Sequence, residues 1–284
     1  MTAAGGRAVW LDGALVPAER AALSIDDPGT RWGEGLFETM RAEGGRAGLL
    51  ERHLDRLEGS AAALGLAPMP ARAAMRAGVA EALAASGADP ARVRLTATPR
   101  PTLLVDVVPE APLPAEPAAV TAVAVRGAWW PGNRLAEHKT LSYLGHRAAQ
   151  RLAERAGAGH ALLLDAEGRL GEAALANVFV ATEAGPVTAP ARGLLPGVAR
   201  AIAAAAVGAR EEALDETVWR AAPEIVLTNA VAGALAVAAV DGRQVGDGRP
   251  GALARAIATA MSAAWGSLPT VERGRSGAQG AEVA

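Results

Sequence analysis

The sequence predicts a mixed α/β (α+β) fold of two domains. Hydrophobic residues make up 51% of the 284 residues and charged residues 20%, as in an ordinary globular chain with a buried core. Strand-like segments do not alternate strictly with helices, which argues against a doubly wound nucleotide-binding fold. Three prolines within residues 110–117 remove backbone donors and stiffen the chain. We therefore expect a small α/β domain over residues 1–110, a linker over 111–118 and a larger domain over 119–284, with a mobile tail after about 267.

The first domain is expected to contain a hairpin, two helices and three further strands. Turn residues and period-two alternation mark the strands, and apolar side chains three or four residues apart mark the helices. These elements are expected at residues 9–16, 32–41, 50–64, 71–85, 92–98 and 102–108.

The second domain is expected to contain five strands and three helices on the same criteria. The strands are expected at residues 120–126, 161–165, 177–181, 224–229 and 235–240. The helices are expected at residues 144–156, from about 196 onward, and at 251–265.

Charge and composition exclude several classes of protein. The net charge is −2 with both signs interspersed, so no basic stripe indicates nucleic acid and no cationic helix indicates a membrane surface. The absence of cysteine excludes disulfides, thiolate nucleophiles and cysteine-bound zinc, and no metal site is expected. The first residues lack a secretory pattern, and the apolar run at 230–240 is too short to span a bilayer. We expect a cytoplasmic protein.

The chain contains a single lysine, Lys139, among 28 lysine and arginine residues. A coding bias toward arginine explains most of this composition, because arginine can replace lysine on a solvated surface. Arginine cannot replace lysine where a neutral amine must form an imine, because guanidinium keeps its proton in proteins. Lys139 is therefore a candidate for amine chemistry.

Three segments supply what pyridoxal phosphate requires from a protein. The cofactor needs a lysine that holds it as a Schiff base, an acid beside its ring nitrogen and an anion site for its phosphate. Lys139 stands at the entrance to a helix, Glu172 precedes a strand, and Pro196-Gly197 opens a helix. A surface turn and an ordinary helix start explain Glu172 and Pro196-Gly197 equally well when each is taken alone. The ordered set predicts a pyridoxal-phosphate enzyme.

The ordered set resembles the fold-type IV (class IV) pyridoxal-phosphate family, which includes aminodeoxychorismate lyase and the branched-chain and D-amino-acid aminotransferases. The resemblance covers nearly the whole chain. It implies a two-domain fold of the D-amino-acid-aminotransferase type and a homodimer in which the neighbouring subunit helps to wall the pocket. The segments that carry it are residues 32–39, 52–57, 137–144, 171–179, 194–200, 228–230 and 240–246.

The resemblance implies a role for each matching residue. Lys139 is the Schiff-base lysine and general acid/base, Glu172 pairs with the ring nitrogen, and Arg56 contacts the phosphate. A solvated helix face is the alternative for Arg56, and core packing is the alternative for Tyr143. Ala199 stands where the aminotransferases commonly have threonine, so one hydroxyl contact to the phosphate is missing. The remaining cofactor contacts are the backbone of Val198 and Ala199, the turn at Asn229 and Ala230, and Tyr143 near the ring oxygen.

Four residues are candidates for contact with a small-molecule substrate: Phe37, Arg94, Arg126 and Arg134. An arginine can bind a carboxylate through two parallel hydrogen bonds, but a surface charge explains each of these arginines equally well.

Four other residues are given mainly structural interpretations. His53 and His138 are interpreted as packing or capping residues. Trp129 and Trp130 are interpreted as a pocket wall, a domain seam or core filling.

Two activities compete on this scaffold, and three features favour the lyase. These are the turn Thr228-Asn229-Ala230, the short approach over residues 133–139 and the spacing from Lys139 to Tyr143. The lyase would convert aminodeoxychorismate to 4-aminobenzoate and pyruvate, a step toward folate. The segment at 98–101 counts against it, because many lyases have glycines there and this chain has none. A branched-chain or D-amino-acid aminotransferase is the alternative, and a non-catalytic ligand-binding relative is a third.

Overall fold

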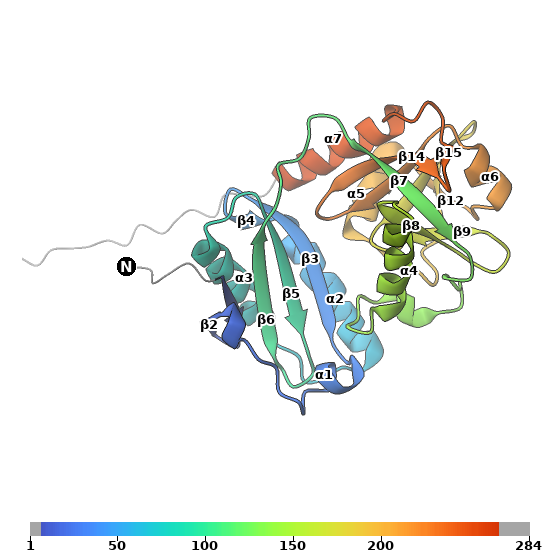
Figure 1. The fold of residues 1–284 in the computed structure, drawn as a ribbon. Coiled ribbons are helices and arrows are strands. Elements are labelled where there is room, and N and C mark those ends of the chain that lie inside the picture. The colour runs from blue at the N-terminus through green and yellow to red at the C-terminus, as the bar shows by residue number, and fades with distance from the viewer. Residues whose placement is uncertain (1–6, 267–284) are drawn as a thin grey trace, which may run out of the picture.

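The computed structural model describes residues 7–266 and contains two β-sheets with helices packed against them (Figure 1). The strands of the first sheet lie in the order β2-β1-β6-β5-β3-β4, and every pairing within it is antiparallel. Its strands are β1 (Ala8–Leu11), β2 (Ala14–Pro17), β3 (Leu36–Glu43), β4 (Arg46–Ala47), β5 (Ala91–Ala97) and β6 (Leu103–Pro109). The helices of this half are η1 (Ala18–Arg20), α1 (Pro28–Trp32), α2 (Leu50–Leu64) and α3 (Arg72–Ser86).

Helices α2 and α3 cover one face of the first sheet. Leu54 and Leu57 of α2 and Val93 and Leu95 of β5 belong to one buried cluster, so the odd-numbered side chains of β5 face the helices. Burying each such side chain stabilises the fold by about 1.5–3 kcal/mol. The intervening Arg92 and Arg94 must face the other way, because successive strand side chains alternate. The sheet therefore has an apolar side toward the helices and a basic side toward the second half of the molecule.

The prediction of a strand over residues 32–41 was wrong at its start. Residues 28–32 form α1, which begins at Pro28 and is capped by Asp27, whose carboxylate accepts the Gly29 N–H at 2.7 Å. Gly33 ends the helix in the left-handed conformation (φ 71°), which glycine adopts without steric cost. The strand β3 begins only at Leu36.

The second sheet has nine strands in the order β12-β11-β10-β13-β14-β7-β8-β9, with β15 paired to β14. Its strands are β7 (Ala118–Val125), β8 (His160–Leu164), β9 (Leu170–Ala173), β10 (Asn177–Thr182), β11 (Gly185–Thr188), β12 (Arg210–Glu211), β13 (Ile225–Asn229), β14 (Gly233–Val240) and β15 (Arg243–Gln244). The helices are η2 (Arg134–Glu137), α4 (Leu144–Arg155), α5 (Val198–Val207), α6 (Glu216–Ala221) and α7 (Ala252–Gly266).

Helices α5 and α7 pack together on one face of the second sheet. Their buried Ala203 and Ile257 lie in one cluster with Phe179 and Val226 of the central strands. Helix α4 packs separately against β7 and β8 through Ala149 and Ala153. The N-terminal ends of α4 and α5 are among the parts of the second half that line the cavity described below.

The two halves are joined by the segment between β6 and β7. Arg41, which is 2% exposed, donates a side-chain hydrogen bond to Ala111 O at 3.0 Å, and its backbone N–H donates to Ala230 O at 3.0 Å.

The strand β7 starts at Ala118, one residue inside the predicted linker, and the division into domains stays a prediction. The predicted tail after about 267 lies outside the described residues. Within residues 7–266, no helix combines the length and apolarity needed to cross a membrane.

Candidate active site

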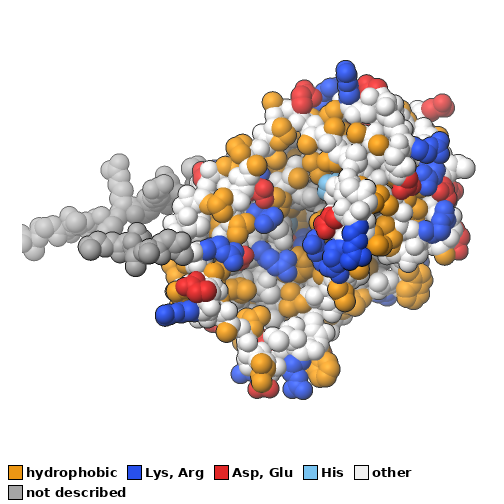
Figure 2. Space-filling view, in the orientation of Figure 1, with side chains coloured by type: hydrophobic (Ala, Val, Ile, Leu, Met, Phe, Trp, Pro, Cys, Tyr) orange, Lys and Arg blue, Asp and Glu red, His pale blue; other side chains and the backbone are white. Residues whose placement is uncertain are grey.

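A cavity of about 530 Å³ lies between the two halves of the molecule and is lined from both. The first half contributes side chains from β3, α2, β5 and β6, and the second half contributes the Lys139 segment, α4, β9, the start of α5 and the turn after β13. In Figure 2, basic side chains lie on both sides of a hollow between the first sheet and α4. The cavity brings together Phe37, Arg56, Arg94, Lys139, Tyr143, Glu172, Val198, Ala199, Asn229 and Ala230.

Lys139 is held at the junction of the halves by backbone pairing. The Phe37 N–H donates to Lys139 O at 2.9 Å, and the Leu141 N–H donates to Gly35 O at 2.9 Å. Its Nζ lies 4.3 Å from the centre of the Phe37 ring and 5.1 Å from that of Tyr143. Burial, aided by the positive charge of Arg56 and Arg94, lowers the pKa of Lys139 to about 8. A useful fraction of the amine is therefore neutral near physiological pH.

Glu172 lies on β9 with 4% of its surface exposed. Asn177 Nδ2 donates to its Oε2 at 3.2 Å, and His146 Nε2 lies 3.4 Å from its Oε1. Burial raises the pKa of Glu172, and the hydrogen bond from His146 opposes that rise. The result is a carboxyl group held in a fixed direction inside the cavity.

The N-terminus of α5 offers an anion site. Gly197 is the N-cap, no side chain caps the helix, and Val198 and Ala199 form its first turn. The N–H groups of a first turn point outward and carry a partial positive charge. Thr228 Oγ1 is buried in the same cavity without a hydrogen-bond partner among the described residues.

Arg56 connects α2 to this anion site. Its Nη1 donates to Pro196 O at 3.2 Å, and its Nε and Nη2 donate to Glu38 at 2.8 and 2.5 Å. His53 Nδ1 lies 2.7 Å from the same carboxylate. Burial opposes ionisation of Glu38, but Arg56 and His53 outweigh it and lower its pKa to about 2.

The sequence did not reveal Glu38. It gave only a weak signal, since His53 and Arg56 lie three residues apart on one helix face. The packing interpretation of His53 is compatible with its exposed fraction of 1%.

Asn229 and Ala230 line the cavity, but the Asn229 side chain is used within its own turn. Its Oδ1 accepts the N–H groups of Val231 and Ala232 at 2.9 and 2.8 Å. This contact fixes the turn, so Asn229 acts there by shaping the backbone. Tyr143 lies edge-on to Phe37, with ring centres 5.2 Å apart.

Arg126 and Arg134 were expected near the substrate, and the structure does not bring them to the cavity. Arg126 pairs with Glu216 of α6 at 2.5 Å, outside the set of lining residues. Arg134 is exposed on η2 and also lies outside that set. Arg126 directly follows β7 and Arg134 begins η2, and the sequence pattern does not specify in which direction either side chain points.

The two adjacent tryptophans have different surroundings. Trp129 fills the core beside Gly171 and donates from Nε1 to Gly193 O at 2.8 Å, as the core interpretation predicted. Trp130 is 68% exposed and lies outside the pocket wall, which corrects that prediction. His138 Nδ1 lies 3.0 Å from Ser60 Oγ.

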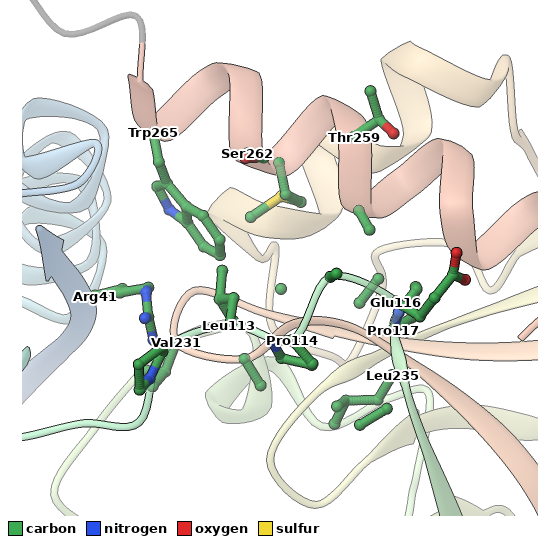
Figure 3. Close-up of a pocket in the computed structure, with 18 of the residues that line it drawn as sticks. Arg41, Leu113, Pro114, Glu116, Pro117, Val231, Leu235, Thr259, Ser262 and Trp265 are labelled. Carbon is green, nitrogen blue, oxygen red and sulfur yellow. The ribbon is translucent and has the colours of Figure 1, made fainter. Parts of the chain in front are cut away.

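A second cavity, of about 770 Å³, lies between residues 110–118 and α7. Figure 3 shows Trp265 of α7 and Leu113 and Pro114 of the linker around it. Val231 and Ala232 line both cavities, so the turn after β13 separates them. The second cavity contains neither Lys139 nor Glu172 and has mainly apolar walls.

Comparison with known proteins defines the class of this enzyme. Residues 35–240 match the family described as amino-transferase class IV, and the chain belongs to that family of pyridoxal-phosphate enzymes. It is similar to a hypothetical aminotransferase from Mycobacterium tuberculosis in its pyridoxal-phosphate-bound form, with a TM-score of 0.80 and 28% identity over 91% of this chain and 98% of that one. The fold is the mixed α/β fold of this family, as the sequence predicted.

Two relatives carry different names. A bifunctional aminodeoxychorismate lyase / D-amino acid transaminase from Mycobacterium tuberculosis is 33% identical over 62% of this chain and 66% of its own length. A branched-chain-amino-acid aminotransferase-like protein 1 from Arabidopsis thaliana is 26% identical over 88% of this chain. The chain spans about half the length of that plant relative (49%).

The residues of the cavity fit pyridoxal phosphate. A lysine amine and a buried carboxyl face one space, and the uncapped helix start offers N–H groups to an anion. The unpartnered hydroxyl of Thr228 gives a further donor for a phosphate oxygen. Lys139, Glu172, Arg56, Thr228 and the start of α5 are the groups that could hold the cofactor.

Proposed function

We propose that this enzyme is an aminodeoxychorismate lyase, which converts 4-amino-4-deoxychorismate to 4-aminobenzoate and pyruvate. The observation that carries the proposal is the charge of the cavity beyond Lys139. Arg94 and Arg147 line it and make no ion pair within residues 7–266. Two unpaired arginines suit a substrate with two carboxylates, as aminodeoxychorismate has. The bifunctional relative adds support, since its name includes this lyase.

Lys139 is the residue of this chain that transfers protons in the proposed reaction. When bound, the cofactor supplies an electron sink for charge that develops on the substrate carbon next to the amine. Lys139 attaches the cofactor, removes the proton from that carbon and returns a proton later. Its neutral amine, favoured by the pKa of about 8, is the form that accepts the proton.

Other residues bind and orient the cofactor and the substrate. Glu172 would hold a proton at the ring nitrogen of the cofactor, and the N–H groups of Val198 and Ala199 would bind its phosphate. Arg94, whose guanidinium lies 3.8 Å from the centre of the Phe37 ring, is placed to bind a substrate carboxylate. Departure of pyruvate leaves an aromatic ring, which makes the step effectively irreversible.

A class IV aminotransferase acting on branched-chain or D-amino acids is the second candidate. Two observations favour it: the segment at 98–101 lacks the glycines common in the lyases, and several relatives are named as aminotransferases. The same groups would serve, with the Lys139 proton returned to a different carbon.

We also propose a cytoplasmic homodimer. Large apolar side chains are exposed at Ile25 (80%), Trp32 (66%) and Leu144 (72%), and a subunit interface could bury such side chains. Light scattering on the active enzyme tests this, and a stable active monomer contradicts it.

The deciding experiment compares two reactions of the purified enzyme. One sample receives aminodeoxychorismate, and others receive pairs of an amino acid and a keto acid. We expect 4-aminobenzoate and pyruvate from the first and slow transamination from the others. Rapid transamination without 4-aminobenzoate would favour the second candidate and leave the cofactor assignment intact.

A further inference from the structure

The first turn of α4 places two stacked rings beside Glu172. Tyr143 and His146 lie three residues apart, so they share a helix face. Their ring centres are 4.4 Å apart and their planes differ by 6°. The stack fixes the imidazole, because its ring cannot rotate without losing that contact.

Both rings are directed at β9 and the residue that follows it. Tyr143 Oη donates to Ala174 O at 3.1 Å, and His146 Nε2 lies 3.4 Å from Glu172 Oε1. Asn177 Nδ2 donates to the other oxygen, Oε2, at 3.2 Å, and also to Leu195 O at 2.9 Å. Each oxygen of the carboxylate therefore has its own hydrogen-bonding partner: Asn177 of β10 donates to Oε2, and His146 of α4 donates to Oε1 when its Nε2 carries the hydrogen.

Two donors on separate oxygens affect both the direction and the charge of the group. They fix the plane of the carboxylate, which would otherwise rotate about its last bond. Hydrogen bonds to an ionised carboxylate also favour that form against the effect of burial. A carboxylate that pairs with a protonated ring nitrogen needs both properties.

We propose that His146 is a positioning residue, which donates from Nε2 to Glu172 and keeps that carboxylate ionised and aimed at the ring nitrogen of the cofactor. The inference rests on the proposed cofactor role of Glu172. The His146 side chain is 22% exposed and that of Glu172 is 5% exposed, so the contact is mostly shielded from solvent, and Glu172 is the partner that lines the cavity. The histidine acts through Glu172 and is not assigned contact with the substrate.

Three variants on α4 separate the hydrogen bond from the stack. His146→Phe keeps a flat ring against Tyr143 and removes the donor. His146→Gln keeps an amide donor near the same place. Arg151→Gln is the matched control, because Arg151 is exposed on the same helix and does not line the cavity.

We expect His146→Phe to raise the dissociation constant of pyridoxal phosphate about fivefold and to lower kcat about tenfold, with KM within about twofold. The near-visible band of the bound cofactor should shift its pH midpoint in this variant. His146→Gln should restore both affinity and kcat to within about threefold of the wild type. Arg151→Gln should match the wild type throughout.

The proposal is overturned if His146→Phe matches Arg151→Gln in cofactor affinity, spectrum and kcat. If His146→Phe does not fold, His146→Ala gives the same test without a bulky ring. Loss of fold in both variants assigns His146 a structural role and overturns the proposal. A wild-type protein without a cofactor adduct at Lys139 instead contradicts the proposed function, so the two failures are distinguishable.

Discussion

The two cavities of this protein differ in charge more than in size. The larger, of about 770 Å³, has mainly apolar walls, and its charged residues are paired, as Glu116 is with Arg255. The smaller, of about 530 Å³, holds Lys139 and Glu172 together with arginines that have no ion-pair partner within residues 7–266. Groups left with unused charge or hydrogen-bonding capacity are costly unless a ligand meets them. Unpaired charges therefore favour the smaller cavity as the candidate site, whereas cavity volume alone would favour the larger.

The largest expected effect comes from removing the amine from the smaller cavity. Lys139→Arg keeps a positive charge and a similar volume but cannot form the covalent bond to the cofactor. We expect turnover to fall by more than about a thousandfold with the fold retained. Borohydride reduction followed by peptide mapping should place the cofactor on Lys139 in the wild type and nowhere in the variant. Wild-type rates with a normal thermal transition would refute the assignment.

Neutralising the buried acid should have the next largest effect. Glu172→Gln still lets the cofactor bind but no longer favours a proton on its ring nitrogen. We expect kcat to fall by more than about tenfold, equivalent to about 1.4 kcal/mol of barrier. Steady-state kinetics beside a cofactor-binding titration measures this, and a smaller loss would contradict the pairing of Glu172 with the ring.

The rate at which Lys139 of the apoprotein reacts with pyridoxal phosphate should depend on pH, and this dependence tests whether the smaller cavity perturbs the amine. The pKa of Lys139 is lowered to about 8, and only the neutral amine reacts. Capture by the apoprotein should therefore slow by about tenfold for each pH unit below 8 and level off above it. Stopped-flow absorbance follows the reaction. A midpoint near that of an exposed lysine would show that the cavity does not perturb the amine.

Changes to the larger cavity should have the smallest effect. Leu113→Ala removes an apolar contact in its wall and should lower the free energy of unfolding by about 1 kcal/mol. We expect kcat and KM to stay within about twofold of the wild type. Assays of activity and thermal unfolding on one preparation provide the measurement. A tenfold loss of activity would show that the larger cavity takes part in the reaction.

The sequence predicted the chemistry better than the local geometry. The cofactor was predicted from residue types that have few substitutes in this chemistry, and the structure brings the two candidates Lys139 and Glu172 to one cavity. Long periodic helices such as α2 and α3 were predicted to within a residue or two. The short elements β9, β11 and α6 were not predicted, because four to six residues show no clear period.

The direction in which a side chain points was the other property that the sequence did not predict. Arg94 and Arg126 look alike in sequence, yet one faces the cavity and the other pairs with Glu216. His146 and Glu38 were missed because their roles depend on contacts with residues distant in the chain. Such contacts are fixed by tertiary packing, which no local pattern encodes.

The hydrogen bond from Arg41 to Ala230 has a consequence for biosynthesis. It joins the third strand of the chain to a turn that the ribosome makes much later. The first sheet and its helices precede the second sheet in the chain, so they can begin to fold while translation continues. The anion site cannot exist until β13 and its turn have emerged. The candidate anion site is therefore completed late in synthesis, and a ligand that binds the completed site stabilises the folded chain by mass action.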